Sequence, residues 1–428
     1  MKLLRGEPAA EAVVSLAHRY AAFDPEVEAR VAEIVKRVRA GGDAALLEYA
    51  RKFDGLAEGA PMRVPARELK AAVGKVSKEF IRAVETAAKN IRRFAEWQLP
   101  RPWVRTVHPG LKVGQVVRAL ESVACYAPGG RYPLPSTVLM TAIPAQVAGV
   151  KRIAVASPRP AAETLAAAHL IGVSEFYRIG GAQAVAAFAY GTQSVPAVNK
   201  IVGPGNTYVT LAKKLVAFDC GIDFLAGPTE MIYCAAEGNP EYIASDMVAQ
   251  SEHDPEALSI FITTNLRLAK AVIEQATAMA ADNEIARQSL GARGVVLVAR
   301  SRKQAMEWTN QLGGEHLTVP LGDLDAVTCA GSIFVGDYTA QSIGDYASGP
   351  NHTLPTGNVA RYRGGLNVMD FVRIITLQEA SRKGLQTIAP TVTLLAEAEG
   401  LKGHAASVRA RLRPGTPTAG ALGTPVKP

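Results

Sequence analysis

The stretch Val123-Ala124-Cys125-Tyr126-Ala127-Pro128-Gly129-Gly130 decides the fold, because a short apolar run passes directly into a glycine-rich turn. Helical stretches separate this run from later ones of the same kind, and strands alternating with helices at this pitch predict a parallel sheet in a doubly wound α/β unit. Ligands bind such sheets at the carboxyl ends of the strands, which is where the turns lie. The later runs are Arg152 to Ser157 before Pro158-Arg159-Pro160, Glu175 to Ile179 before Gly180-Gly181-Ala182-Gln183, and Lys200-Ile201-Val202 before Gly203-Pro204-Gly205-Asn206.

None of these turns has the GxGxxG pattern, so the usual dinucleotide fingerprint is missing. The backbone N–H groups of a glycine-rich turn can cradle a phosphate, but a tight turn alone also explains the glycines. Both interpretations stay open from the residues alone.

A second alternation of strands and helices follows the first. We therefore expect an α/β protein with two incomplete Rossmann-like, doubly wound domains, a helical N-terminal region and a small C-terminal segment. The expected strands are Met231 to Cys234, Ala257 to Thr263, Val295 to Val298, Leu317 to Val319 and Ser332 to Val335. The expected divisions are an N-terminal segment 1–23, a first α/β domain of 24–125 plus 234–365, a second of 126–233, and a C-terminal segment with tail, 366–428.

The flanking regions have other patterns. Residues 24–98 are predicted to be largely helical, with Gly41-Gly42 as a stop, and the three prolines of Pro100 to Pro109 predict a linker. Leu385 to Gly400 predicts a helix that ends near Gly400. Arg413 to Pro428 is rich in Pro, Gly and Thr and predicts a mobile tail.

Composition narrows the class of protein. The formal charge of +8 is spread along the chain without interleaved aromatic residues, so we expect no nucleic-acid partner. The four cysteines lie far apart, which argues against a zinc cluster of cysteines and against a disulfide framework. No apolar run reaches the roughly 18 residues that a membrane helix needs. These features predict a cytoplasmic protein without a membrane segment.

Gln250 and His253 are the first polar pair with possible chemistry. Asn239-Pro240-Glu241 predicts a helix start, and Pro255 ends the helix, so the two side chains face the same way in its last turn. An amide oxygen and an imidazole can ligate a metal, but for this pair taken alone capping or packing is the commoner explanation.

Glu315 and His316 form an acid–base pair before a predicted strand. In a regular strand they would point to opposite faces, so a shared site needs irregular backbone, which Gly313-Gly314 permits. Asp345 and His352 lie in a polar loop that is suited to metal or substrate binding.

Glu399 and His404 bracket a helix end and bring another acid and imidazole together. For each of these segments, an ordinary solvated loop is the alternative interpretation. The residues alone do not decide between the two.

Taken together, the motifs resemble those of histidinol dehydrogenase, a zinc- and NAD-dependent family that completes histidine biosynthesis. The resemblance covers about residues 24–412. The motifs stand in the family's order: Tyr126 to Gly130 with Ser136 to Met140, Gly180 to Ala184, Gly203 to Asn206, Ala226-Gly227-Pro228, Gln250 to His253, Glu315-His316, Asp345 to Pro355, and Ala396 to Gly400 with His404.

The resemblance implies a role for each matching residue. It implies an intertwined homodimer with one zinc per subunit, in which His404 reaches the other subunit's site. Thr229 stands where the family usually has Ser, which keeps the hydroxyl. The implied zinc ligands, also in contact with substrate, are Gln250, His253, Asp345 and His404; the implied NAD+ contacts are Tyr126, Gln183 and Asn206; and further implied substrate contacts are Thr229, His316, His352 and Glu399.

The implied reaction oxidises L-histidinol to L-histidine through L-histidinaldehyde, with two NAD+ and one water. His316 would be the general base and Glu315 would activate the water. Two alternatives are a related zinc- and NAD-dependent enzyme for another small alcohol, such as a sulfonated diol, and a non-catalytic α/β protein that holds zinc structurally and binds an anion.

Overall fold

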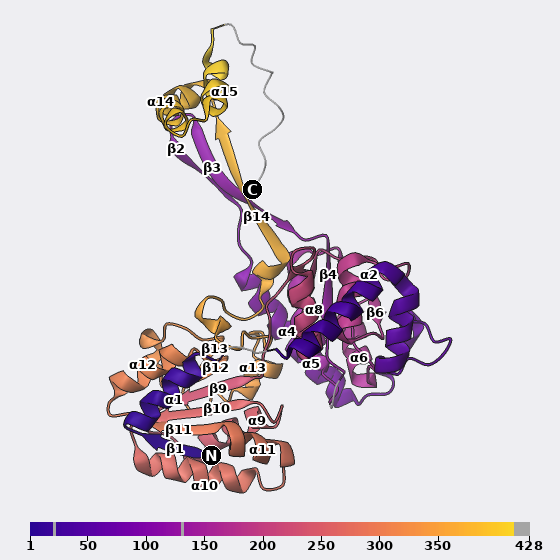
Figure 1. Ribbon diagram of the computed structural model, residues 1–428, viewed down its shortest axis with the longest axis vertical. Helices are drawn as coiled ribbons and strands as arrows, with labels where there is room; N and C mark the ends of the chain where they lie inside the picture. The colour runs from indigo at the N-terminus through magenta and orange to yellow at the C-terminus, as the bar shows by residue number, and fades with distance from the viewer. Residues whose placement is uncertain (20–22, 130–131, 415–428) are drawn as a thin grey trace. The chain divides into compact units, whose positions relative to one another are not determined.

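The computed structural model describes residues 1–19, 23–129 and 132–414. The chain divides into two compact units: unit 1 comprises Met1–Gln98 and Leu120–Phe371, and unit 2 comprises Leu99–Ala119 and Val372–Pro428 (Figure 1). Gly130 of the first predicted turn and residues 415–428 of the predicted tail lie outside the described residues.

A five-stranded parallel sheet in unit 1 contains the four predicted strand-and-turn runs. Its order is β6-β5-β4-β7-β8, and every neighbouring pair is parallel. The strands are β4 (Ser122–Tyr126), β5 (Arg152–Ala156), β6 (Glu175–Tyr177), β7 (Lys200–Val202) and β8 (Gly221–Ile222). Its helices are α5 (Pro135–Ala148), α6 (Ala162–Leu170), α7 (Gly181–Tyr190) and α8 (Thr207–Val216).

Both faces of this sheet are buried. Along β4, Val123 and Cys125 belong to one apolar cluster, with α5 and α6, while Ala124 and Tyr126 belong to another, with α7 and α8. Successive side chains of a strand point to opposite faces, so helices must cover both sides. The predicted doubly wound architecture is confirmed.

The second sheet of unit 1 is parallel and six-stranded, in the order β1-β11-β10-β9-β12-β13 (Figure 1). Helices α1 and α12 share one apolar cluster with this sheet, and α9, α10 and α11 share the other. The strands are β1 (Lys2–Arg5), β9 (Glu230–Cys234), β10 (Leu258–Thr263), β11 (Gly294–Val298), β12 (His316–Val319) and β13 (Ser332–Val335). The helices are α1 (Glu7–Ala17), α9 (Pro240–Ser251), α10 (Leu266–Met279), α11 (Glu284–Arg293), α12 (Arg302–Leu312) and α13 (Ser342–Tyr346).

The N-terminal helices follow the prediction at the expected stop and differ from it in their grouping. Gly42 interrupts α2 (Pro25–Asp54) with non-helical angles, φ 54° and ψ −135°, so α2 consists of two helical segments on either side of a kink. α2 packs on α7 of the five-stranded sheet, which contradicts the expected grouping of residues 24–125 with 234–365. The reason is that the apolar stripe of α2, including Val31, Ile34 and Val38, matches the surface of α7. Two further helices follow, α3 (Ala66–Val73) and α4 (Lys78–Gln98).

The predicted boundaries also cut through strands. Residue 126 is the last of β4, and residue 234 is the last of β9, so the two sheets begin and end a few residues earlier than expected. The predicted N-terminal segment 1–23 supplies β1 and α1 to the six-stranded sheet.

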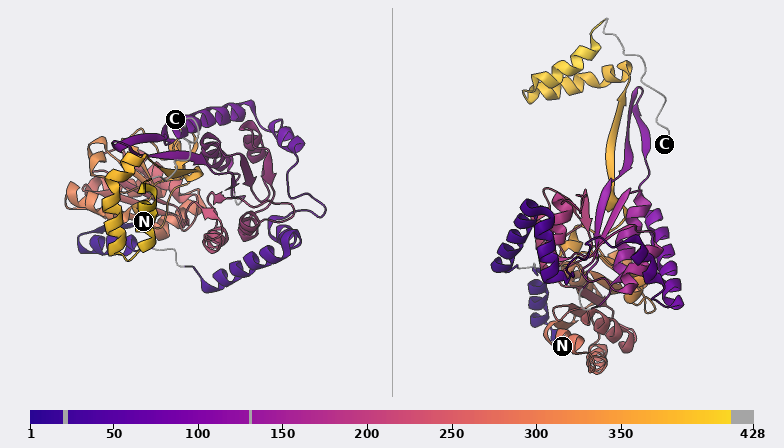
Figure 2. Two further views of the ribbon diagram at one scale, coloured as in Figure 1. Left: turned by 90° about the horizontal axis from the view of Figure 1, so that it is seen from above. Right: turned by 90° about the vertical axis from the view of Figure 1, so that its right-hand side faces the viewer.

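Unit 2 is an antiparallel three-stranded sheet, β14-β3-β2, with two helices packed on each other (Figure 2). The predicted linker at Pro100 to Pro109 is therefore wrong in part, because β2 occupies most of it. A second helix follows Gly400, beyond the predicted end. The elements are β2 (Trp103–His108), β3 (Leu111–Ala119), β14 (Val372–Ala380), α14 (Arg382–Ala398) and α15 (Lys402–Leu412).

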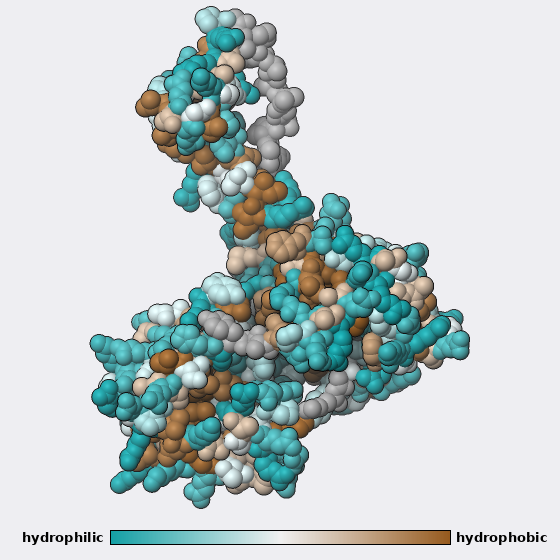
Figure 3. All heavy atoms as spheres, viewed as in Figure 1, coloured by the Kyte–Doolittle hydropathy of each residue, from teal (hydrophilic) through white to brown (hydrophobic). Residues whose placement is uncertain are grey.

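Many apolar side chains of unit 2 are exposed. On the face that Figure 3 shows, brown spheres of hydrophobic residues lie among teal ones in this unit. The exposed apolar side chains come from both the sheet and the helices, so this unit leaves apolar surface in contact with solvent. They are Trp103, Val104, Val107, Ile374, Ile375, Leu394, Leu395 and Leu401. In the part of the chain that is described, no helix combines the length and apolar character needed to span a membrane.

Candidate functional site

A cavity of about 440 Å³ lies at the carboxyl edge of the five-stranded sheet. Tyr126 ends β4, Gln183 lies in the first turn of α7 after β6, and Asn206 caps α8 after β7. All three line this cavity, together with Gly129, Pro158 and Tyr208. The three predicted cofactor contacts, far apart in sequence, are therefore brought together at the edge where glycine turns predicted a ligand.

Two acceptors hold the start of α7 at this cavity. Asp54 Oδ2 accepts from Gly180 N at 2.9 Å and from Gln183 Nε2 at 3.0 Å, and Tyr126 Oη accepts from Gly181 N at 3.1 Å. Burial raises the pKa of the Asp54 carboxyl, and the hydrogen bonds from Gly180 and Gln183 lower it by less. Asp54 fixes the Gln183 side chain and was not predicted from the sequence.

The turn at Gly203 is held by a buried ion pair between Lys213 and Asp223. Lys213 Nζ donates to Gly203 O at 2.9 Å, and Gly203 N donates to Asp223 Oδ2 at 2.7 Å. Gly203 has a φ of 114°, and a Cβ there would overlap the backbone oxygen of Tyr126. Only glycine lets the two strand ends approach this closely.

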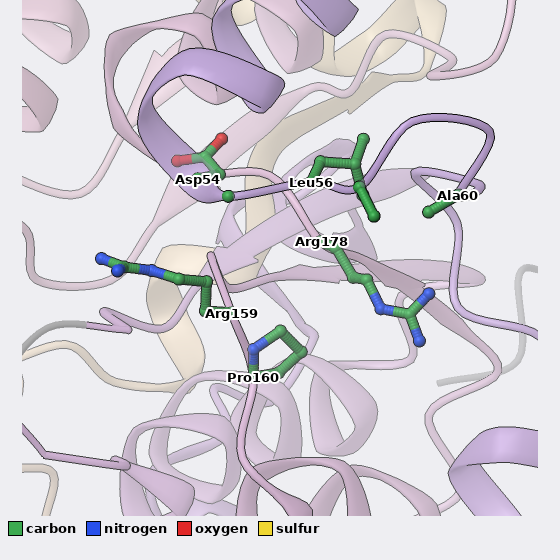
Figure 4. A pocket seen from close by; sticks show the side chains of 8 residues that line it. Asp54, Leu56, Ala60, Arg159, Pro160 and Arg178 are labelled. Atoms are coloured by element: carbon green, nitrogen blue, oxygen red, sulfur yellow. The ribbon is translucent and has the colours of Figure 1, made fainter.

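A second cavity, of about 260 Å³, shares Asp54 and Arg159 with the first (Figure 4). Arg159 adopts a φ of 47°, which is uncommon for a residue with a side chain. Arg178, which also lines this cavity, forms an ion pair with Glu68.

Glu315 and His316 lie at the amino edge of the six-stranded sheet, where β9 and β12 begin. His316 is the first residue of β12, and Glu315 precedes the strand. Gly313 ends α12 in the left-handed conformation, with a φ of 53°. The irregular backbone predicted from Gly313-Gly314 is therefore present, and both side chains are buried within 3.8 Å of each other, from His316 Nδ1 to Glu315 Oε2.

The Glu315 carboxylate is bound by the start of β9. Its Oε2 accepts from Thr229 Oγ1 at 2.6 Å and from Glu230 N at 2.7 Å. Burial raises the pKa of Glu315 to about 7, against the opposing effects of the nearby His316 and the Thr229 hydroxyl. A carboxyl with a pKa near neutrality can serve as an acid or a base in cells.

The His316 ring is oriented by two acceptors. Nδ1 lies 3.3 Å from Glu230 O, and Nε2 lies 3.3 Å from Asp345 Oδ1. Burial lowers the pKa of His316, but Glu315 and Asp345 outweigh it and raise the pKa to about 9. Both partners are acceptors, so at neutral pH each ring nitrogen carries a proton, with Nδ1–H directed at Glu230 O and Nε2–H at Asp345 Oδ1.

Gln250 and His253 flank the end of α9, whose start is capped by Asn239 as predicted. Gln250 is buried and donates from Nε2 to Thr229 Oγ1, whereas His253 is exposed just beyond the helix. α9 therefore ends earlier than expected, but Gln250 still reaches the residues that hold Glu315.

Asp345 and His352 complete the cluster. α13 carries Asp345 within the segment expected to lack helix, and His352 Nδ1 lies 2.8 Å from Asp345 O. Burial alone would raise the pKa of Asp345, but His316, His352 and His253 lower it. His352 Nε2 lies 3.2 Å from Thr137 Oγ1 on α5. Thr229, Gln250 and Glu315 thus form one hydrogen-bonded group, and His316, Asp345 and His352 form another. The backbone of Glu230 joins the two groups, and His253 is close enough to affect Asp345.

Asp246, one turn before Gln250 on α9, was missed by sequence reasoning. Burial raises the pKa of Asp246 to about 6, while nearby His316 lowers this pKa and nearby Asp345 raises it. Its Oδ1 accepts from Gln341 N at 3.3 Å. Its position four residues before Gln250 was the signal that could have identified it.

Glu399 and His404 belong to unit 2. Glu399 caps the end of α14, His404 lies in the first turn of α15, and both are exposed. Within the described ranges, no group of three or more His, Cys, Asp or Glu side chains is arranged to hold a metal ion.

Residues 17–412 match a family model described as histidinol dehydrogenase. The chain belongs to the histidinol dehydrogenase family. Curated histidinol dehydrogenases from Syntrophotalea carbinolica and Aquifex aeolicus are each 44% identical to it over 400 and 406 residues. These matches cover 90% and 92% of the chain, and 93% and 95% of the relatives.

The crystal structure of histidinol dehydrogenase from Elizabethkingia anophelis is similar to the whole chain. The TM-score is 0.92 at 34% sequence identity, and the match covers 96% of this chain and 98% of that one. The family that the motifs indicated, and its two-sheet α/β fold, are therefore confirmed.

Proposed function

We propose that the chain oxidises L-histidinol to L-histidine at the Glu315–His316 cluster, using the cavity of the five-stranded sheet for NAD+. The alcohol passes through L-histidinaldehyde and its hydrate, and two NAD+ and one water are consumed as two NADH and three protons form. The observation that carries this proposal is the buried acid–base pair, hydrogen-bonded to Thr229 and Asp345, in a chain of this family.

His316 is the general base of this proposal. Its Nε2 would accept the proton of the alcohol, and later that of the hydrated aldehyde, while Nδ1–H stays directed at Glu230 O. The negative charge of Asp345 raises the pKa of His316. A cation bound by Asp345 would offset this negative charge, so the pKa of His316 would fall and the imidazole would be neutral, as a base requires.

Glu315 is proposed to activate the water that adds to the aldehyde. Thr229 and Glu230 hold one carboxylate oxygen, Oε2, so Oε1 is the oxygen proposed to take a proton from water. The raised pKa makes this carboxylate a stronger base than an ordinary surface glutamate.

The donor set fits zinc. Gln250 Nε2 donates to Thr229 Oγ1, which leaves the Gln250 side-chain oxygen as the atom that could bind a metal. Asp345 lies close enough to His253 for their charges to interact. Amide oxygen, imidazole and carboxylate are all groups that bind zinc or similar divalent ions. A zinc ion held by Gln250, His253, Asp345 and the His404 of a second subunit would fix the substrate and polarise its hydroxyl.

The cavity of about 440 Å³ also fits part of a dinucleotide. Tyr126 and Tyr208 offer aromatic surface, Asn206 offers an exposed amide, and Gly129 and Gly181 line the cavity without side chains. NAD+ supplies the hydride acceptor, and the residues of the chain would set its orientation.

We further propose that a second copy of the chain covers the exposed apolar side chains of unit 2, such as Trp103, Ile375 and Leu394. Exposed apolar residues from both the sheet and its helices are typical of a subunit interface. His404 and Glu399 are carried by the same unit, which supports their contribution to the site of the other subunit.

The test of the function is NADH formation with purified full-length chain and L-histidinol, before and after chelation and zinc return. We expect two NADH for each substrate, loss of activity on chelation and recovery with zinc. Metal-replete protein that is inactive with L-histidinol, or active only with a sulfonated diol, would exclude this function.

The proposal for His404 has a separate test. Both His404→Ala and His253→Ala should lose zinc and activity, and re-formed mixed dimers should regain part of the activity, because one of the two sites then has all its ligands. Mixtures that stay inactive would contradict a site shared between subunits.

A further inference from the structure

Glu230, the first residue of β9, holds both proposed catalytic side chains with its backbone. Its N–H donates to Glu315 Oε2 at 2.7 Å, and its carbonyl oxygen lies 3.3 Å from His316 Nδ1. The orientation of this one residue therefore sets the positions of the acid and the base relative to each other.

The Glu230 side chain is fixed in turn by Arg19. Arg19 Nε donates to Oε1 at 2.7 Å, and Nη2 donates to Oε2 at 2.6 Å, in the paired geometry that arginine forms with carboxylates. Gly357 N adds a bond to Oε1 at 3.0 Å. The side chains of Arg19 and Glu230 are only 15% and 5% exposed, so water competes little with these bonds.

Arg19 is itself anchored at several points. Its Nη1 donates to Leu16 O at 2.8 Å, at the end of α1, and to Asn358 Oδ1 at 3.1 Å. Asn358 adopts a left-handed φ of 71° and donates from Nδ2 to Ala17 O at 2.8 Å. The guanidinium thus joins α1, the loop at Asn358 and the start of β9.

We propose that Arg19 and Glu230 are positioning residues for the reaction, which act by fixing the backbone that holds Glu315 and His316. This inference rests on the proposed function, because it assigns a role in that chemistry to two residues that are not themselves proposed to contact substrate. Arg19 lies 211 positions before Glu230 in sequence, so the N-terminal segment would control turnover as well as folding.

The chain offers a matched control in the pair Arg152–Glu175. Arg152 Nε and Nη2 donate to the two oxygens of Glu175 at 2.9 and 2.7 Å, and Glu175 is also the first residue of a strand, β6. The two side chains are 26% and 12% exposed. This pair has the same chemistry and a comparable burial, but it contacts neither Glu315 nor His316.

The experiment compares Arg19→Met with Arg152→Met in the metal-replete, full-length protein. Both variants should lower Tm. Only Arg19→Met should lower kcat for L-histidinol oxidation, by about tenfold or more, while the KM for NAD+ stays within about twofold because the cofactor cavity is on the other sheet. Arg19→Lys should recover part of the kcat through a single ion pair.

Glu230→Gln carries the test if Arg19→Met does not fold. The amide keeps the shape and one contact to Arg19, so kcat should fall several-fold with an unchanged KM for NAD+. Normal kcat in folded Arg19→Met or Glu230→Gln would overturn the proposal, as would an equal loss of kcat in Arg152→Met. Inactivity of the wild-type protein would instead refute the proposed function.

Discussion

At the five-stranded sheet, the residues proposed to bind the cofactor follow their strands, whereas at the six-stranded sheet the proposed catalytic residues stand where strands begin. Tyr126 ends β4 and Asn206 follows β7, but Glu315 precedes β12 and contacts the start of β9. The free N–H groups at the amino edge of a parallel sheet explain the difference, because the N–H of Glu230 can bind a carboxylate there. The carboxyl edge offers glycine turns and helix starts instead.

The two edges also differ in charge. The cofactor cavity is lined mainly by neutral side chains and close backbone, with Asp54 and Arg159 as its charged members. The other edge gathers ionisable groups whose pKa values are shifted by one another, among them Glu315, His316 and Asp345. One edge is suited to holding a ligand by shape, and the other to moving protons.

The largest expected effect comes from removing the base at the amino edge. His316→Asn keeps a donor that can face Glu230 O but removes the Nε2 acceptor, so kcat should fall about 10²- to 10⁴-fold. Zinc content and NAD+ binding should stay near normal, because His316 is not a proposed ligand of either. Steady-state kinetics with metal analysis checks this.

If His316→Asn instead lost its metal, the role of His316 as a base would be contradicted. If it lost NAD+ binding, the separation of the two edges would be wrong, because the cofactor cavity contains neither His316 nor its hydrogen-bond partners.

A smaller effect is expected at the carboxyl edge from Gly203→Ala. The added Cβ overlaps the backbone of Tyr126 and forces strain at a φ of 114°, so the turn must move. The KM for NAD+ should rise about tenfold or more with little change in zinc content. Gly172→Ala is the control, because Gly172 has a φ of 77° but no neighbouring atom within 4 Å of the added Cβ.

A KM for NAD+ that rises as much in Gly172→Ala as in Gly203→Ala would show that general destabilisation, not the close approach of two strand ends, is responsible. Kinetics at several NAD+ concentrations, with Tm measured on the same samples, separates the two causes.

The local parts of this architecture could be predicted from the sequence. Each run that ends in a glycine turn became a strand of the five-stranded sheet, because apolar runs and turns are encoded by neighbouring residues. Gly313-Gly314 likewise indicated the irregular backbone that places Glu315 and His316 together. The strand β2 was missed because its burial pattern has no buried face, so it lacks the apolar alternation that identifies a half-buried strand.

The supporting residues of the site could not be predicted, because their partners are distant in sequence. Arg19 meets Glu230 across 211 positions, and Asp54 meets Gln183 across 129. A single charged residue in an ordinary helix end or loop carries no local sign of such a partner. The assignments of the zinc, substrate and cofactor residues, including Glu399 and His404, stay predictions that the variants above address.

The smallest expected effect is on the pH dependence of stability, through Asp54→Asn at the cofactor edge. Burial raises the pKa of Asp54 in the folded chain, so folding favours its protonated form. Its favourable contribution is complete below the unfolded pKa of about 4 and is lost as pH rises through the folded pKa. Asparagine can accept from Gly180 N and Gln183 Nε2 on one oxygen, so the variant should gain Tm relative to wild type as pH rises.

Asp43→Asn, at the start of the segment of α2 that ends at Asp54, is a control of opposite sign. Partial burial would raise the pKa of Asp43, but hydrogen bonds from Ser194 and Thr192 outweigh it and lower the pKa. The stability from Asp43 is therefore present above its unfolded pKa and lost on acidification, so this variant should lose Tm relative to wild type as pH rises toward about 4, with little further change above it. Measurements of Tm against pH for the three proteins check both signs.

Parallel curves of Tm against pH for wild type and Asp54→Asn would mean that Asp54 is ionised as freely in the folded chain as in the unfolded one. The cofactor edge would then hold a full negative charge.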